Sequence, residues 1–178
     1  MNIDLIPVGT NPPWDINVII ENTKGGNPVK YELDKKSHAM FVDRFLYTAM
    51  SYPGNYGFIP HTLAEDGDPI DVLVVGPVAV MPGAVVRSRP IGMLQMIDEA
   101  GNDEKILAVP VDQLHPYYTD VHTYRDLPEI LLEQITHFFT HYKDLERGKW
   151  AEVGGWDGPE TAAAAIRTSM ERAREKTA

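Results

Sequence analysis

The sequence contains no cysteine. This absence excludes disulfides, thiolate nucleophiles, iron–sulfur clusters and zinc held by cysteine. The glycine loop of the Walker type, the Gly-x-Ser-x-Gly turn of serine hydrolases and the dinucleotide fingerprint are also missing. His137 and His141 have the i, i+4 spacing of helical zinc ligands, but only Phe-Phe-Thr stands between them. Because that segment has no Glu, the zinc-protease motif is absent as well.

Basic residues are scarce, since 16 Lys and Arg stand against 26 Asp and Glu and the net charge is −10. An acidic surface repels a phosphate backbone, which disfavours nucleic acid as a partner. Long apolar runs are missing too: the longest uncharged stretch, residues 72–86, is interrupted by glycine and proline and is too short to span a bilayer. The N-terminus has Asp4 and Pro7 where a signal peptide needs a basic start. We therefore expect a cytoplasmic protein without a membrane partner.

The composition otherwise suits an ordinary folded domain. The chain has 178 residues, of which 43% are hydrophobic and 24% are charged. No linker, repeat or shift in composition divides it, so we expect a single domain over residues 1–178. Its 14 glycines and 14 prolines exceed average usage and favour a body rich in β-strands and turns.

Several short segments have the pattern of strands. Residues 16–21 and 29–34 alternate in polarity on either side of a turn-rich segment, which predicts a β-hairpin. Further strands are expected at residues 71–75, 84–89, 90–97 and 105–109. Short strands separated by Gly and Pro turns predict an OB-like closed β-barrel.

Two helices are expected late in the chain. Residues 126–146 form the first, with Asp126 as its cap and Pro128 in its first turn, and residues 159–176 form the second. One apolar stripe of the first helix suits packing on the barrel: Leu131, Ile135, Phe138 and Tyr142. A different stripe suits a subunit contact: Gln134, His137 and His141. The predicted fold is mainly β with α, a closed barrel with two C-terminal helices packed on it.

An acidic segment, Glu65-Asp-Gly-Asp-Pro-Ile-Asp71, stands directly before an apolar stretch. Gly67 and Pro69 favour a tight turn, which crowds Asp66, Asp68 and Asp71 together. Crowded carboxylates repel one another unless a cation lies between them. Oxygen-only ligands suit a hard cation such as Mg²⁺, Mn²⁺ or Ca²⁺. An exposed acidic turn is the alternative, but the third acid and the stiffening proline favour a metal site.

The segment is not an EF-hand calcium loop. Counted from Asp66, Asp71 stands at the sixth position, where glycine is required, and Pro77 at the twelfth, where glutamate is required. A second acidic pair, Asp98 and Asp103, flanks a turn between two expected strands. By itself this pair is typical of a polar hairpin turn. Beside the first acidic segment it could complete a centre with several metals.

Four basic residues lie next to these features: Lys30, Arg44, Lys105 and Lys143. Each alone is typical of a solvated surface charge. A metal cluster flanked by Lys and Arg, however, is suited to holding and cleaving a compact phosphate. The rigid segment 51–60 presents Tyr52 and Tyr56, whose hydroxyls could donate to phosphate oxygens or simply pack in the loop.

The segment Asp66-Gly-Asp-Pro-Ile-Asp71-Val matches the signature of the soluble family I inorganic pyrophosphatases at every position, and the chain resembles their bacterial type over nearly its whole length. Other positions share the likeness: Glu21, Lys30, Glu32, Arg44, Tyr52, Tyr56, Asp98, Asp103, Lys105, Tyr142 and Lys143. The resemblance implies Mg²⁺-dependent hydrolysis of pyrophosphate to two orthophosphates by a metal-activated water. It also implies several Mg²⁺ per site, with Mn²⁺ or Zn²⁺ as possible substitutes, and a homohexamer built from two trimers.

The resemblance also implies a role for each site residue. The metal ligands would be Asp66, Asp71, Asp98, Asp103 and Glu21. Asp68 would act as the catalytic base on the water. The phosphates would be held by Lys30, Arg44, Tyr56, Tyr142 and Lys143. Supporting roles would fall to Glu32, Tyr52 and Lys105.

Two other classes of protein remain as alternatives. An OB-fold that binds nucleic acid would need surface aromatics and a positive face, and the net charge of −10 counts against it. A calcium-binding module would explain the acidic residues. It would leave the four basic residues near them without a role.

Overall fold

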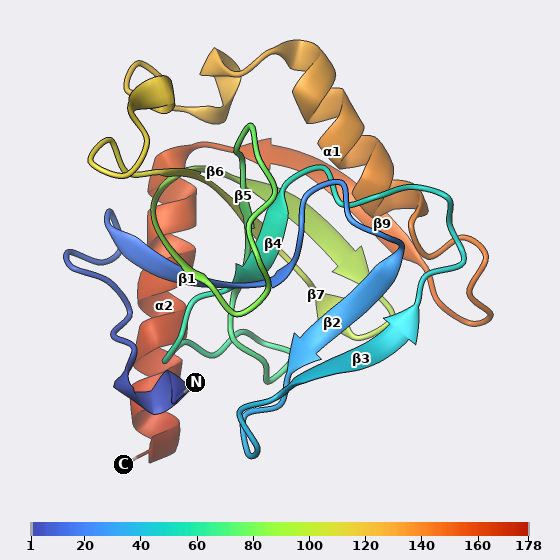
Figure 1. Cartoon of the computed structure of the whole chain (residues 1–178), viewed down its shortest axis with the longest axis horizontal. Coiled ribbons are helices and arrows are strands. Elements are labelled where there is room, and N and C mark those ends of the chain that lie inside the picture. Colours follow the sequence, from blue (N-terminus) through green and yellow to red (C-terminus); the bar gives the residue numbers. More distant parts are fainter. Residues whose placement is uncertain (1, 178) are drawn as a thin grey trace.

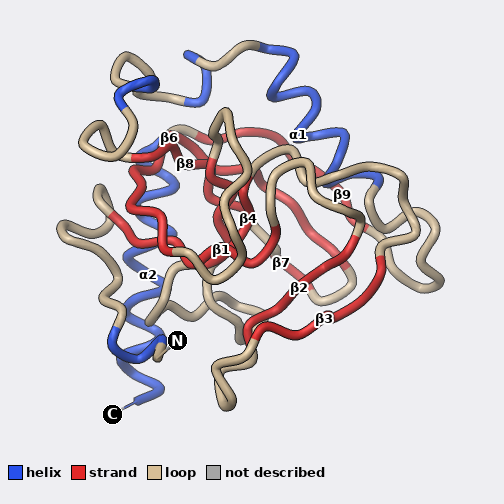
Figure 2. Tube along the Cα trace, viewed as in Figure 1, coloured by secondary structure: helices blue, strands red, loops and turns tan. Residues whose placement is uncertain are grey.

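The computed structural model describes residues 2–177. A seven-stranded sheet occupies its centre, and the helices lie outside it (Figures 1 and 2). Hydrogen-bonded neighbours follow the order β1-β4-β5-β8-β6-β7; β1 also pairs with β6, and β9 adds to β6. The strands are β1 (Ile16–Asn22), β4 (Asn55–Phe58), β5 (Asp71–Val74), β6 (Val85–Asp98), β7 (Gly101–Asn102), β8 (Lys105–Pro110) and β9 (Ala151–Asp157). The mainly β body with two helices agrees with the prediction.

A separate two-stranded sheet consists of β2 (Val29–Leu33) and β3 (Met40–Phe45), which pair antiparallel. The predicted hairpin between residues 16–21 and 29–34 is therefore wrong, because β1 pairs with β4 and β6 instead. β1 is almost wholly buried, as an inner strand is, whereas β2 is mostly half-buried. Where β1 passes β2, the side-chain amide of Asn22 donates to the C=O of Tyr31 and accepts from its N–H. These two hydrogen bonds take the place of the backbone hydrogen bonds that a hairpin would have formed there.

Other strand predictions need correction. Residues 84–89 and 90–97 form one continuous strand, β6, with a bulge between Pro90 and Gly92 in its pairing with β8. β3, β4 and β9 were not predicted. β4 is short and lies inside the turn-rich segment 51–60, where its Gly57 lets the backbone of β1 approach closely. A Cβ on Gly57 would lie 1.9 Å from the carbonyl oxygen of Ile19.

The first long helix, α1 (Glu129–His141), is shorter than expected. Asp126 does not cap it. Instead Asp126 ends a short 3₁₀ helix, Tyr124–Asp126, and its carboxylate accepts hydrogen bonds from the backbone N–H groups of His122 and Thr123. Turns follow α1, and α2 (Pro159–Thr177) matches the second predicted helix closely.

The two helices pack against different hydrophobic clusters of the sheet. Ile135, Phe138 and Phe139 of α1 join one cluster, together with Leu94 and Leu107. The cluster beneath α2 contains residues of β1, β8 and α2, among them Ile16, Ile106, Ala162 and Ile166. The two helices thereby cover different parts of the sheet (Figure 1). No helix in the described part of the chain is long and apolar enough to cross a membrane.

Candidate active site

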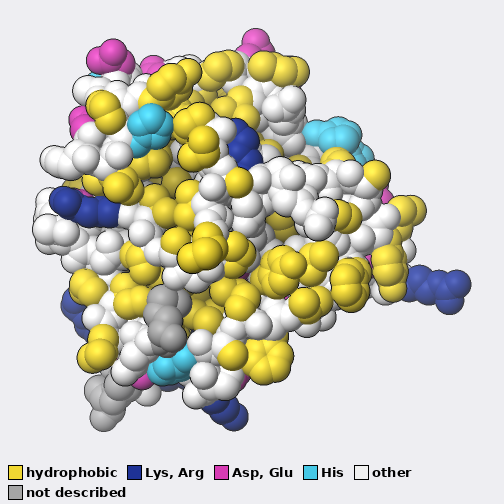
Figure 3. All heavy atoms as spheres, viewed as in Figure 1, with side chains coloured by type: hydrophobic (Ala, Val, Ile, Leu, Met, Phe, Trp, Pro, Cys, Tyr) yellow, Lys and Arg dark blue, Asp and Glu magenta, His cyan; other side chains and the backbone are white. Residues whose placement is uncertain are grey.

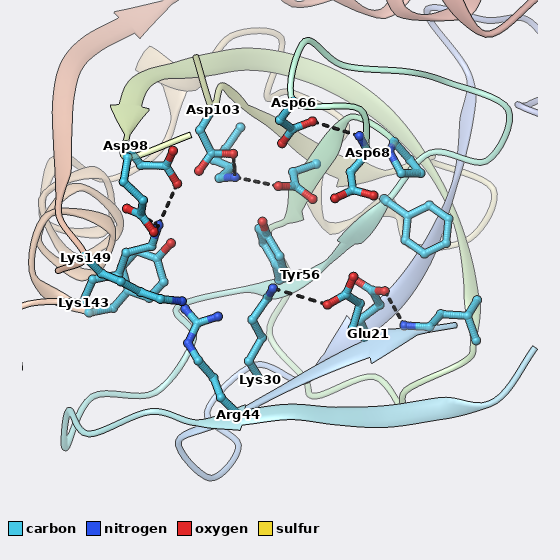
Figure 4. A pocket seen from close by; sticks show the side chains of 18 of the residues that line it. Glu21, Lys30, Arg44, Tyr56, Asp66, Asp68, Asp98, Asp103, Lys143 and Lys149 are labelled. Atoms are coloured by element: carbon cyan, nitrogen blue, oxygen red, sulfur yellow. Dashed lines mark hydrogen bonds and ion pairs between the residues drawn. The ribbon is translucent and has the colours of Figure 1, made fainter. Parts of the chain in front are cut away.

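One cavity of about 230 Å³ collects the side chains that the sequence singled out (Figure 4). They come from β1, β4, β8, the β2–β3 sheet, the acidic segment leading into β5, the end of β6 and the turns that follow it, and the turns after α1. The predicted residues that line the cavity are Glu21, Lys30, Glu32, Arg44, Tyr56, Asp66, Asp68, Asp71, Asp98, Asp103, Lys105, Tyr142 and Lys143. Segments far apart in the sequence therefore meet at one place.

Lys105 links the two acidic segments. β5 and β8 run parallel with Asp71 opposite Lys105, so their side chains share one edge of the sheet. The buried ammonium of Lys105 lies 2.6 Å from Asp71 Oδ2 and also donates to Asp103 Oδ1. Burial opposes this charge, but the attraction of Asp71 and Asp103 outweighs it and raises the pKa of Lys105. Lys105 therefore stays charged and compensates two carboxylates at once.

The acidic segment turns sharply at Gly67, whose φ of 95° lies in the left-handed region that glycine adopts readily. The turn brings the N–H of Asp68 to 3.0 Å from Asp66 Oδ1. Partial burial raises the pKa of Asp66, and the neighbouring charges of Asp71 and Asp68 add to the effect. The carboxylate of Asp68 is mostly exposed and points into the cavity (Figure 4).

The second acidic pair lies on the same cavity, as the sequence suggested. Asp98 ends β6, and its carboxylate is 2.6 Å from the buried ammonium of Lys143. Partial burial opposes the charge of Asp98, but hydrogen bonds from Lys143 and from the N–H of Ala100 outweigh it and lower its pKa. Burial raises the pKa of Asp103 to about 6, although Lys105 acts in the opposite direction.

Glu21 enters the cavity from β1. Its side chain is buried, and its Oε1 accepts a hydrogen bond of 2.8 Å from the N–H of Leu33. Burial raises the pKa of Glu21 to about 8, despite that hydrogen bond, and the nearby charge of Asp71 contributes. A nearby cation would stabilise the charged form of such a carboxylate.

The phosphate-binding candidates line another part of the cavity wall. Lys30 and Arg44 are cross-strand partners in the β2–β3 sheet. Arg44 Nε lies 2.9 Å from the buried Glu146, and its terminal nitrogen lies 2.8 Å from Asp43, so the guanidinium is held from two sides. Tyr142 and Lys143 follow α1 directly.

The two tyrosines of segment 51–60 have different positions. Burial raises the pKa of Tyr56 well above its usual value, so its hydroxyl keeps its proton and remains a donor toward the cavity. Tyr52 does not line the cavity. Its ring is buried behind Tyr56, with ring centroids 5.2 Å from Tyr56 and 4.8 Å from Phe138.

The donor set fits a hard divalent cation by its chemistry. It consists of carboxylate oxygens only, the ligands that such a cation prefers. Burial and neighbouring negative charges raise the pKa values of Glu21, Asp66 and Asp103, and a bound cation would lower these pKa values again. As the described side chains stand, no three acidic or histidine groups lie close enough to hold one ion. Lys105 and Lys143 occupy the space between the carboxylates. Coordination would require some of these side chains to rotate.

Sequence reasoning missed several residues of the cavity. Lys35, Glu99 and Lys149 line it, and Glu146 holds Arg44 from behind. Lys35 lies in a turn and Lys149 in an irregular segment, where a charged residue is ordinary and carries no signal of its own. The partner of Arg44 depends on a contact between segments far apart in the chain, so no local pattern could have identified it.

Known proteins resemble this chain in sequence. Residues 18–174 match the profile of the family described as inorganic pyrophosphatase. An inorganic pyrophosphatase of Caulobacter vibrioides is 64% identical over 98% of this chain and 99% of its own length. One from Brucella melitensis biotype 1 is 58% identical over 99% of this chain and 100% of its own length.

Solved structures resemble it as well. The crystal structure of an inorganic phosphatase from Anaplasma phagocytophilum has a TM-score of 0.93 at 50% identity, over 95% of this chain and 99% of that one. The inorganic pyrophosphatase of Thermus thermophilus has a TM-score of 0.92 at 40% identity, over 98% of this chain and 99% of that one. Family profile, sequence and fold agree over nearly the whole length, and the chain belongs to the inorganic pyrophosphatase family.

Proposed function

We propose that this member of the inorganic pyrophosphatase family hydrolyses pyrophosphate to two orthophosphates with Mg²⁺ as its metal. The observation that carries the proposal is the meeting of two acidic segments with the cations of the β2–β3 sheet and of the turn after α1 in one cavity. Carboxylates suit the metals, and lysine and arginine suit the four negative charges of fully ionised pyrophosphate. A calcium-binding module would have no use for the second group.

The proposed metal ligands are Asp66, Asp71, Asp98, Asp103 and Glu21. Several Mg²⁺ would bind in one site, and Mn²⁺ or Zn²⁺ could substitute. When bound, the metal supplies positive charge that lowers the pKa of water and neutralises phosphoryl oxygens. Lys105 and Lys143 compensate the same carboxylates in the free chain, so they keep the acidic cluster from repelling itself before metal arrives.

The phosphates would be held by Lys30, Arg44, Lys143, Tyr56 and Tyr142. Charged donors make shorter and stronger hydrogen bonds to phosphate oxygens than neutral donors do. Arg44 is suited to this role because its guanidinium donates a hydrogen bond to Asp43 and forms an ion pair with the buried Glu146, which limits its movement. Glu32 lies 3.7 Å from the ammonium of Lys30, and Tyr52 packs behind Tyr56, so both support residues that face the substrate.

Asp68 is the proposed general base. It lies between two proposed metal ligands on the acidic segment, its backbone is fixed by the turn, and its carboxylate points into the cavity (Figure 4). It accepts the proton of the attacking water as the oxygen of that water bonds to phosphorus. The bridging P–O bond then breaks, and the second phosphate leaves with the bridging oxygen.

We also propose self-association, as a homohexamer of two trimers. An apolar groove on the surface is lined by residues of segment 50–53 and of α1, among them Met50, Ile130, Gln134 and His137. Ile130 is 61% exposed in the single chain. Figure 3 shows histidine side chains beside hydrophobic ones over α1. Sedimentation of the wild type and of Ile130→Glu tests this contact, and a monomeric wild type would rule it out.

Phosphate release from pyrophosphate in the presence of Mg²⁺ tests the proposed activity. Asp103→Asn removes a carboxylate of the cavity, whereas Asp112→Asn makes the same change at an acidic residue that does not line it. We expect the wild type and Asp112→Asn to release phosphate at similar rates and Asp103→Asn to be at least about tenfold slower, the usual effect of disturbing a metal site. No release by the wild type, or equal rates for all three proteins, would contradict the proposal.

A further inference from the structure

Lys35 has no role in the mechanism described so far. It lies in the turn between β2 and β3, and it lines the same cavity as the proposed catalytic groups. Its ammonium is 2.8 Å from Asp68 Oδ1, close enough for a direct charged hydrogen bond. In residues 2–177 this is the one ion pair that joins the β2–β3 sheet to the acidic segment.

The side chain of Asp68 depends on this contact. The loop holds only its backbone, because the N–H of Asp68 bonds Asp66 Oδ1 and its C=O accepts from the N–H of Ala64. Within the described part of the chain, Lys35 is the only group hydrogen-bonded to the Asp68 carboxylate. The side chain of Asp68 is 63% exposed, so neighbouring atoms do not restrict it by packing. Lys35 is therefore the contact in the described residues that can orient this carboxylate.

We propose that Lys35 is a positioning residue that aims the carboxylate of Asp68 at the attacking water. The inference rests on the proposed function, in which Asp68 accepts the proton of that water. It gives the β2–β3 sheet two tasks: Lys30 and Arg44 hold phosphate, while Lys35 orients the base on the opposite segment. Binding of the phosphates and placement of the base then depend on one hairpin.

The expected fall in kcat follows from side-chain geometry. An unrestrained aspartate divides its time among three staggered χ1 positions, so without Lys35 the fraction of correctly aimed carboxylate, and kcat with it, should fall about three- to tenfold. Loss of the base itself lowers kcat about 10²–10⁴-fold. An exposed ion pair contributes little to folding, so the chain should remain folded without it.

The test uses Lys35→Met, which removes the charge and keeps the length, and Lys35→Arg, which restores a donor. Lys36→Met is the matched control, because Lys36 is an exposed neighbour that does not line the cavity. We expect Lys35→Met to lower kcat about three- to tenfold with unchanged KM for pyrophosphate and unchanged melting temperature. Lys35→Arg should recover most of kcat, and Lys36→Met should behave as the wild type.

The same substitution in the Asp68→Asn background separates the possible roles. A positioning residue has nothing left to position there, so Lys35→Met should have no further effect on kcat. The proposal is overturned by a raised KM at normal kcat, which would make Lys35 a substrate ligand, by an undiminished effect in the Asp68→Asn background, or by behaviour like Lys36→Met. Failure of the proposed function would look different: the wild type would be inactive, or Asp68→Asn alone would keep its kcat.

Discussion

Asp66, Asp68 and Asp71 are neighbours in one short segment, yet the fold gives each of them a different partner. Asp66 accepts a backbone N–H, Asp68 meets Lys35, and Asp71 meets Lys105. Identical side chains thereby have different surroundings, and the chemistry of a carboxylate depends on its surroundings. We propose metal binding for Asp66 and Asp71 and proton transfer for Asp68.

Asp68→Asn tests this division of tasks. The amide keeps the size of the carboxylate and removes the basic oxygen, so we expect kcat to fall about 10²–10⁴-fold while Mg²⁺ and pyrophosphate still bind. Asp71→Asn is the comparison, since weakened metal binding should be partly recovered by excess Mg²⁺. Both are measured as kcat against Mg²⁺ concentration. If excess Mg²⁺ rescues Asp68→Asn, or kcat hardly changes, Asp68 is not the base.

Residue identities were far easier to predict than residue partners. The spacing of acids around Gly67 and Pro69 indicates a crowded site without any structure, because the turn is local. The attachment of Arg44 to Glu146, or of Lys35 to Asp68, requires knowing which segments meet in space. For Tyr52 the sequence left two options open, a hydroxyl that donates to phosphate or a ring that packs in the loop. The structure shows the second, because the ring is buried against Phe138.

At the scale of elements, alternation in polarity located strands but did not identify their partners. β1 and β2 are both strands at the expected places, yet they belong to different sheets. A turn between two strands produces a hairpin only if the strands pair with each other and not with other strands. The almost complete burial of β1 requires partners on both sides, which β4 and β6 supply. The resulting order leaves the β2–β3 sheet free to contribute Lys30 and Arg44 to the cavity.

Gly57→Ala tests the close approach of β4 to β1. The added methyl group would lie 1.9 Å from the carbonyl oxygen of Ile19, so the strands must separate. We expect a loss of about 3 kcal/mol in the free energy of unfolding, as for other overpacked sites. Gly76→Ala is the control, since its new methyl group would meet nothing closer than 3.7 Å and should cost less than about 0.5 kcal/mol. Equal denaturation midpoints for the two variants would contradict this reading of the strand contact.

At the scale of the whole molecule, the chain carries a net charge of −10, and its cavity gathers eight acidic and six basic side chains. Composition alone made nucleic acid an unfavourable partner, but it could not show that acidic groups gather opposite lysine and arginine. That arrangement arises only when β1, the β2–β3 sheet, the two acidic segments and the turns after α1 come together. An acidic chain with this cavity would bind an anion, because bound metal would first make the net charge of the cavity positive.

Mg²⁺ should therefore stabilise the folded chain. A ligand that binds the native state alone adds about 2.7 kcal/mol at roughly 100 times its dissociation constant. For a chain of this length that corresponds to a rise of about 5–10 °C in melting temperature. Scanning calorimetry with Mg²⁺, and with NaCl at equal ionic strength as the control, measures it. The same rise with both salts would indicate screening of charge in place of binding.

Metal dependence of phosphate release tests the central claim most directly. The purified chain is assayed with pyrophosphate, then after exhaustive chelation, and again after Mg²⁺ is restored. The account predicts that chelation abolishes phosphate release and that Mg²⁺ recovers it, because water at neutral pH is too weak a nucleophile without the metal. Undiminished release of phosphate from the fully chelated chain would contradict it.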